Sequence, residues 1–207
     1  MKLNLPKIIS VFPLSGIIFF PKTNLPLNIF EPRYLTLVND CIKSHKYMGM
    51  IQAKKDSSNV YSIGCLGKIS EYKKIKDGRM LINLTGITRF EIKSEINSDK
   101  IYREFEVSYE KFSEDLKKEE KQIPIDEKIE AIFQKTKVFF KKNGLLLNWN
   151  EFEKLDQNQK INTLAMIAPI SNEEKQTILE SVHINSKTKA LSEIIEFYLH
   201  EKSLSNI

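Results

Sequence analysis

The chain has 207 residues, of which 41% are hydrophobic and 29% are charged, and these values are ordinary for a globular protein. A chain of this length buries about 70% of its unfolded surface, so it can form a core without metal ions or disulfides. Its two cysteines, Cys41 and Cys65, exclude a disulfide framework. Because nothing indicates secretion, we expect both thiols to be reduced and the protein to be cytoplasmic.

The net charge of +5 is unevenly distributed along the chain. Residues 1–112 carry 18 lysines and arginines against 11 acidic residues, a balance of +7, whereas residues 113–207 carry 14 against 16, a balance of −2. A basic front half can attract nucleic acid, anionic membranes or acidic partners. Its lysines are scattered, however, apart from Lys73, Lys74 and Lys76, and a scattered distribution is typical of a soluble surface.

An apolar run at residues 8–20 follows two lysines, as in a signal peptide, but it contains Pro13 and Gly16 and lacks a small-residue cleavage site. It is also shorter than the ~20 apolar residues that a membrane-spanning helix needs. We interpret the run as a core strand and a turn, and we expect no membrane association.

The first half of the chain has the period-two hydrophobicity and the glycine and proline punctuation of short strands. Asp77-Gly78 predicts a type I′ hairpin turn, which needs positive φ at both central residues. Gly64 and Gly67 are expected at bulge or corner positions, and Gly86 is expected to end a strand. The predicted strands lie at residues 8–12, 25–30, 47–53, 60–75, 80–85, 87–92 and 102–109.

Residues 25–34 contain the clearest local signal. The first of them alternate between apolar and other side chains, which is typical of a strand with one buried face. Pro26 has no N–H and therefore predicts a strand that lies at a sheet edge or begins beside a bulge. Pro32 suits the first position of a helix, and Glu31 would lie at the positive end of the helix dipole. We expect an amphipathic helix that ends near Ser44.

The composition changes after residue 112. Residues 113–124 are mostly charged and end in Pro124, so we predict that they form a linker. Residues 125–207 show helical periodicity, with N-caps expected at Asp126, Asn150, Ser171 and Asn185. The predicted fold class is α+β: an N-terminal β pseudo-barrel of residues 1–112 with one inserted helix, followed by a C-terminal helical bundle.

Six motifs occur in order in the first half: VFPL at residues 11–14, FFP at 19–21, LPLNIFEPRY at 25–34, YSIGCLGKI at 61–69, DGR at 77–79 and LTGITRF at 84–90. In order and spacing they resemble the N-terminal substrate-binding domain of Lon-type ATP-dependent proteases. The resemblance implies a PUA-like pseudo-barrel followed by helices and covers nearly the whole chain. The positions expected to hold this fold are Pro13, Pro21, Glu31, Pro32, Gly64, Asp77, Gly78, Gly86, Arg89 and Phe90.

The resemblance also implies a function. It points to a non-catalytic module that binds exposed apolar segments of unfolded or partly folded polypeptides, with an ATP-dependent protease or in a chaperone-like context. None of the seven glycines fits the Gly-x-x-x-x-Gly-Lys-Ser/Thr loop of the family's ATPase, and the chain has no room for the C-terminal domain with the Ser–Lys peptidase pair. We therefore expect a stand-alone recognition domain with no catalytic residue, metal or cofactor.

Two groups of polar side chains invite a chemical interpretation. Cys41 and His45 are four residues apart on one predicted helix face, as metal ligands can be, but no further ligands are identifiable. A buried thiol beside a surface imidazole is the favoured interpretation. Glu31 and Arg33 form a possible acid–cation pair in a cleft, but a structural role at the helix start is favoured because any barrel of this shape must hold that corner.

The remaining candidate is a binding surface. In Phe19-Phe20 and Ile29-Phe30, neighbouring side chains point to opposite faces of an extended chain, so one of each pair must be covered or face solvent. An exposed apolar patch rimmed by cationic and polar side chains would grip unfolded polypeptide, and coverage by the C-terminal helices is the alternative. The candidate polypeptide-binding residues are Phe19, Phe20, Leu27, Phe30, Arg33 and Tyr34.

An RNA-binding PUA-like module is the second hypothesis. Some PUA-type domains bind RNA, and the front half of this chain is basic. The sequence lacks a dense stripe of arginine and lysine interleaved with aromatic residues, which places RNA binding behind polypeptide binding.

Overall fold

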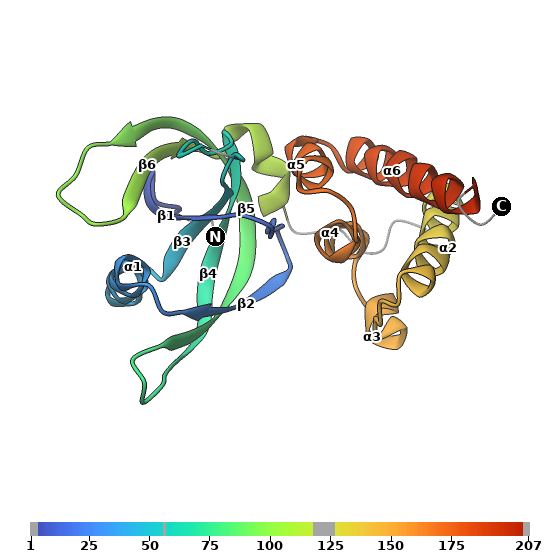
Figure 1. Ribbon diagram of the computed structural model, residues 1–207. Coiled ribbons are helices and arrows are strands. Elements are labelled where there is room, and N and C mark those ends of the chain that lie inside the picture. The colour runs from blue at the N-terminus through green and yellow to red at the C-terminus, as the bar shows by residue number, and fades with distance from the viewer. Residues whose placement is uncertain (1–3, 56, 118–126, 205–207) are drawn as a thin grey trace. The chain divides into compact units, whose positions relative to one another are not determined.

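The computed structural model describes residues 4–55, 57–117 and 127–204 (Figure 1). The chain divides into two compact units, Met1–Lys117 and Lys118–Ile207. The first unit contains all the strands of the described residues, and the second is helical. The predicted α+β class, with a β part followed by helices, is confirmed.

The strands of the first unit form one closed sheet. Its order is β2-β5-β4-β3-β1-β6, and β6 also pairs with β5, so that five strands make a barrel and β2 extends it at one edge. The β1–β3 pair is parallel and the other pairs are antiparallel. The strands are β1 (Ile8–Leu14), β2 (Asn24–Ile29), β3 (Tyr47–Gln52), β4 (Ile63–Lys74), β5 (Met80–Ile96) and β6 (Arg103–Ser108).

The barrel has an apolar core because alternate residues of each strand point inward. One buried cluster comes from five strands and consists of Ile9, Val11, Ile51, Leu66, Phe90, Phe105 and Val107. Helix α1 (Pro32–Lys43) is inserted between β2 and β3 and packs beside β1 and β3 (Figure 1). It begins at Pro32, as predicted, and buries Tyr34, Leu37, Val38 and Cys41.

Strand β5 is one continuous strand of 17 residues, whereas the sequence predicted two shorter strands in its place. Gly86 lies inside it and does not end it. A Cβ atom at this position would lie 2.2 Å from the carbonyl oxygen of Phe20. The glycine therefore allows the backbone before β2 to approach the middle of β5.

The β4–β5 hairpin has a different turn from the predicted type I′. Only Gly78 has positive φ, at 90°, and Asp77 does not. The Gly78 N–H donates to the Ile75 carbonyl (3.1 Å), and the Ile75 N–H donates to the Arg79 carbonyl (2.8 Å). This is a three-residue loop in which Gly78 takes the left-handed position that follows a type I turn.

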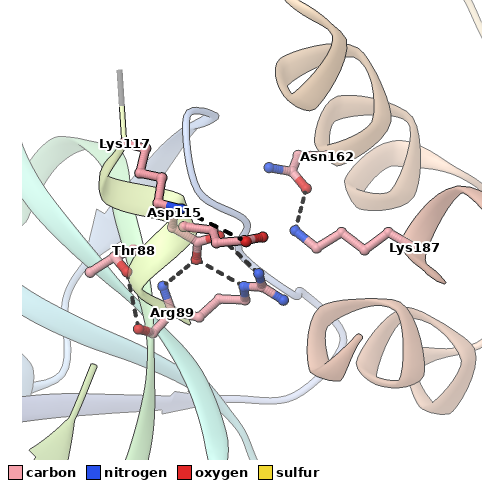
Figure 2. Close-up of polar contacts among 7 residues, drawn as sticks. Thr88, Arg89, Asp115, Lys117, Asn162 and Lys187 are labelled. Carbon is pink, nitrogen blue, oxygen red and sulfur yellow. Dashed lines mark hydrogen bonds and ion pairs between the residues drawn. The ribbon is translucent and has the colours of Figure 1, made fainter. Parts of the chain in front are cut away.

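The start of the predicted linker is part of the first unit. Helix η1 (Glu110–Leu116) is a 3-10 segment beside β5, and Asp115 within it binds the side chain of Arg89 (Figure 2). The high charge of this segment indicated a linker, but one of its charged groups, the Asp115 carboxylate, pairs with the buried Arg89. The rest of the predicted linker, residues 118–124, lies outside the described residues.

The second unit contains five helices among its described residues: α2 (Glu127–Lys142), α3 (Trp149–Glu153), α4 (Gln157–Ile167), α5 (Asn172–Glu180) and α6 (Ile184–Leu204). The capping box at Ser171 is confirmed. The cap of α3 is Asn148 rather than Asn150, and α6 begins before Asn185. Asp126, the predicted cap of α2, lies outside the described residues.

The helical unit has its own core, and buried polar side chains link its helices. Lys187 of α6 is buried and donates from Nζ to Oδ1 of Asn162 on α4 at 3.1 Å (Figure 2). The rings of Phe133 of α2 and Phe152 of α3 pack edge to face, with their centroids 5.7 Å apart. In the described part of the chain, no helix combines the length and apolar character that a membrane crossing requires.

Candidate functional site

Strand β2 is an edge strand, and within the described residues it pairs only with β5. Just before it, Lys22 has a φ of 61°. Its N–H donates to the Gly86 carbonyl (2.9 Å), and the Gly86 N–H donates to the Thr23 carbonyl (2.9 Å). These two bonds make a bulge in which Lys22 holds the left-handed position usually taken by glycine.

The bulge determines which way the backbone groups of β2 point. In an antiparallel strand, the N–H and C=O groups of every second residue point to the same neighbour. Counting from Thr23, the groups of Leu25, Leu27 and Ile29 point toward β5. Those of Asn24, Pro26 and Asn28 therefore point away from the sheet, and all three residues are exposed. The prediction from Pro26 that this strand lies at an edge is confirmed.

Two exposed apolar side chains lie on one face of this edge. Phe30 follows β2 and is 64% exposed, and Leu81 of β5 is 42% exposed. Leu81 pairs with Asn28 on one side and with Lys73 of β4 on the other, and paired residues share a face. Phe30 directly follows β2 and continues its alternation of exposed and buried residues, so we place it on the exposed side together with Asn28. We call these four residues, Asn28, Phe30, Lys73 and Leu81, the β2 outer face.

Unpaired positive charge borders the β2 outer face. Lys73 belongs to it, and Lys74 and Lys76 lie at the end of the same hairpin. Among the described residues, none of the three forms an ion pair, whereas Asp77 is paired with Arg79 at 2.7 Å. The local field is therefore positive and favours acidic over basic partners.

The corner between β2 and α1 is braced by polar contacts. The Glu31 carbonyl accepts the N–H groups of Tyr34 (3.0 Å) and Leu35 (2.9 Å), and the Glu31 carboxylate accepts from Nε of Arg33 (3.1 Å). The Arg33 guanidinium lies 4.5 Å from the centre of the Tyr34 ring, which in turn contacts Phe12 at 4.1 Å. Burial raises the pKa of Tyr34. These contacts favour the structural interpretation of Glu31 and Arg33.

Four of the six candidate binding residues are buried: Phe19, Phe20, Leu27 and Tyr34. Phe19 packs against Gly67, where a Cβ atom would lie 2.8 Å from its ring, and the Phe20 carbonyl accepts from the Thr23 hydroxyl at 2.7 Å. In this conformation, these four side chains support the surface and do not form it. Phe30 and Arg33 are the two candidates that reach solvent.

Cys41 and His45, the pair with metal-ligand spacing, have local contacts in the first unit. His45 accepts the Tyr47 N–H at Nδ1 (3.0 Å), and burial lowers its pKa. Burial raises the pKa of the Cys41 thiol to about 12. No group of three or more His, Cys, Asp and Glu side chains within the described ranges is arranged to hold a metal ion.

Sequence reasoning missed Leu81 and Asp115. Leu81 lies on the polar side of an alternating strand, between the buried Met80 and Ile82, and this out-of-place apolar residue was the available signal. Asp115 lies in a run of charges and had no local signal, because its partner Arg89 is 26 positions away.

Known proteins share this architecture. The Lon N-terminal domain protein from Xanthomonas campestris superposes with a TM-score of 0.66 and 19% identity, covering 89% of this chain and 96% of that one. The N-terminal domain of Mycobacterium avium complex Lon protease superposes with a TM-score of 0.64 and 16% identity, covering 92% and 98%. Both have the same fold.

Sequence comparison adds the family. Lon protease 1 of Hydrogenovibrio crunogenus is 23% identical over 192 residues, which are 90% of this chain and 23% of that protein. Lon protease 1 of Herpetosiphon aurantiacus is 24% identical over 108 residues, 48% of this chain and 13% of that protein, so the chain spans less than a quarter of the length of either relative. A family model matches residues 8–196. The chain belongs to the family of the ATP-dependent protease La (LON) substrate-binding domain.

Proposed function

We propose that this chain recognises unfolded or partly folded polypeptides and that the β2 outer face is the surface that contacts them. Membership of a substrate-binding domain family supports a recognition role. The observation that carries the location is the exposure of Phe30 beside Leu81 at an edge strand. Exposed apolar side chains gathered at one place, with charges around them, are typical of sites that bind other polypeptides.

The buried candidates contribute indirectly to this function. Phe19, Phe20 and Leu27 fill the space beneath β2, and burial of each large apolar side chain contributes about 1.5–3 kcal/mol to folding. They hold β2 in place, so that Phe30 is presented at a fixed position. These buried side chains therefore affect recognition through the stability of the fold, whereas Phe30 affects it by contacting the client.

The context that we propose is proteolysis. The relatives that match are named Lon proteases, and a recognition module would supply them or a similar ATP-dependent protease with clients. We further propose that the chain acts in the cytoplasm and contributes binding rather than catalysis.

The test is a binding titration of the full chain with a fluorescein-labelled model protein kept unfolded by reduction and alkylation. We expect Phe30→Ser to weaken binding about tenfold, since a central aromatic contact is typically worth more than 1 kcal/mol. Phe197→Ser is the matched control, because Phe197 of α6 is 57% exposed and belongs to the other unit. Loss of binding in Phe197→Ser but not in Phe30→Ser would place the surface on the helical unit and contradict the proposal.

Salt dependence separates this function from RNA binding. Apolar contacts change little between low and physiological salt, whereas each phosphate contact adds to a steep loss of affinity. Binding of a single-stranded RNA that falls steeply with salt, together with no binding of unfolded protein, would favour the RNA-binding alternative.

A further inference from the structure

We infer that the client segment binds the open edge of β2 as an additional strand, through its backbone. This inference rests on the proposed function and specifies its mode. Strand addition explains how one surface accepts many sequences, because the main chain supplies the hydrogen bonds whatever the side chains are.

The edge offers a defined set of backbone groups. Asn24 and Asn28 each present one N–H and one carbonyl away from β5, and Pro26 between them presents a carbonyl alone. None of these groups has a backbone partner within the described residues. Exposed edge groups of this kind are a template for pairing with another chain.

Pro26 also limits what can pair. A second copy of β2 meeting this edge would bring its own proline to the interface, so both strands would lack a donor at their centres. When the partner is an extended client without proline, only β2 lacks a backbone donor and the client strand has all of its own. The edge thus disfavours self-association while it remains able to accept a client.

Side chains select among possible clients. An added strand would lie ~4.8 Å from β2, so that its residues on the outer face meet Asn28 and Phe30 directly. Lys73 lies three strand spacings, about 14 Å, from such an added strand, which is beyond the Debye length of about 8 Å at physiological salt, so its charge contributes little to the choice of client. The occupant to which this arrangement commits is therefore an extended client segment with apolar residues on the face toward Phe30.

The first test uses the full, unmodified chain and three labelled peptides. One peptide of about ten residues alternates Leu and Val with Glu, and two derivatives carry N-methyl groups on either the odd or the even backbone amides. N-methylation removes donors without changing side chains. Strand addition predicts that one derivative loses affinity at least tenfold while the other binds nearly as well as the parent, because only one edge of the peptide faces β2.

The second test removes a donor from the protein. Asn28→Pro deletes the outward N–H of Asn28 without breaking a bond to β5, and Asn28→Ala keeps it. We expect Asn28→Pro to bind the parent peptide about fivefold more weakly than Asn28→Ala, because both variants lose the same side chain and only the proline also loses the N–H. Thermal unfolding shows whether each variant is folded, and the methylated peptides need no variant at all.

The outcomes separate this inference from the proposed function. If both methylated peptides bind like the parent while Phe30→Ser abolishes binding, strand addition is wrong and polypeptide recognition stands. If the parent peptide and the unfolded model protein both fail to bind the wild-type chain, both proposals fail. If sedimentation shows a dimer that Asn28→Pro dissociates while peptide affinity is unchanged, the edge is an interface between two copies, and the inference is overturned.

Discussion

Asp115 and Arg89 form a bidentate ion pair inside the first unit. Asp115 Oδ1 accepts from Nη2 of Arg89 at 2.8 Å, and Oδ2 accepts from Nε at 2.9 Å and from the Arg89 backbone N–H at 3.0 Å. The two side chains are only 1% and 9% exposed, and the Phe112 ring centre lies 4.2 Å from the guanidinium carbon. This pair attaches η1 to the middle of β5.

Asp115→Asn tests this attachment. The substitution leaves the buried Arg89 charge without an anion, and breaking one side of such a pair typically costs about 3–5 kcal/mol. We expect a loss of that order in the stability of the first unit, measured by hydrogen exchange of the β5 amides. The control is Asp77→Asn, which breaks the exposed pair with Arg79 and should leave stability nearly unchanged, because water screens an exposed pair. Equal effects of the two substitutions would contradict the structural role of Asp115.

Gly86→Ala tests the close approach of the chain before β2 to β5. The new methyl group would lie 2.2 Å from the Phe20 carbonyl oxygen, so a backbone segment must move, at a cost of about 1–3 kcal/mol. In Gly67→Ala the new methyl group would lie 2.8 Å from the Phe19 ring. This variant should lose less stability than Gly86→Ala, because a side chain adjusts more easily than the backbone. Urea unfolding of the two variants gives the comparison, and a larger loss in Gly67→Ala would be the contrary result.

Phe30 and Phe20 should separate binding from folding. Phe30→Ser removes an exposed side chain and should change the unfolding free energy by no more than about 0.5 kcal/mol. Phe20→Ala removes a fully buried ring and should cost about 3–5 kcal/mol. Denaturant unfolding measures both. A large stability loss in Phe30→Ser would mean that its effect on binding cannot be assigned to contact.

His45 should make stability fall in mild acid. Burial lowers its pKa in the folded state, so the unfolded chain takes up a proton first as the pH falls below about 6.5. The contribution of neutral His45 is fully present above that pH and decreases as the pH approaches the folded-state pKa. Unfolding free energies at about pH 7.5 and 5.5 measure the decrease. His45→Asn keeps an acceptor for the Tyr47 N–H but does not titrate, and it should show a smaller pH dependence than the wild type.

The two thiols should be unreactive in the folded protein. Cys41 and Cys65 are both buried and neither forms a disulfide, and the raised pKa of Cys41 keeps its thiolate fraction negligible near neutral pH. A chromogenic disulfide reagent should therefore label neither thiol rapidly under native conditions and both in denaturant. Rapid native labelling of Cys41 would show that α1 opens readily from the barrel.

The sequence by itself determined the local structure of this protein. The alternation up to Ile29, the missing N–H of Pro26 and the fixed φ of Pro32 specify an edge strand followed by a helix, and all three act within a few residues. The change of period likewise indicated a β part followed by helices, although residues 113–117 belong to the first unit. The motifs indicated the family, to which the chain belongs.

Only the tertiary structure decided which of those residues meet solvent. Phe19, Phe20 and Phe30 have similar sequence contexts, but Phe19 packs against Gly67 and Phe20 approaches Gly86, and both are buried, whereas Phe30 is exposed. The pairing of Asp115 with Arg89 also depends on the tertiary structure, because the two residues are 26 positions apart in the sequence. Burial and ion pairing depend on which strands lie side by side and in which register, and register is set by contacts between distant segments, whereas periodicity is set by neighbours along the chain.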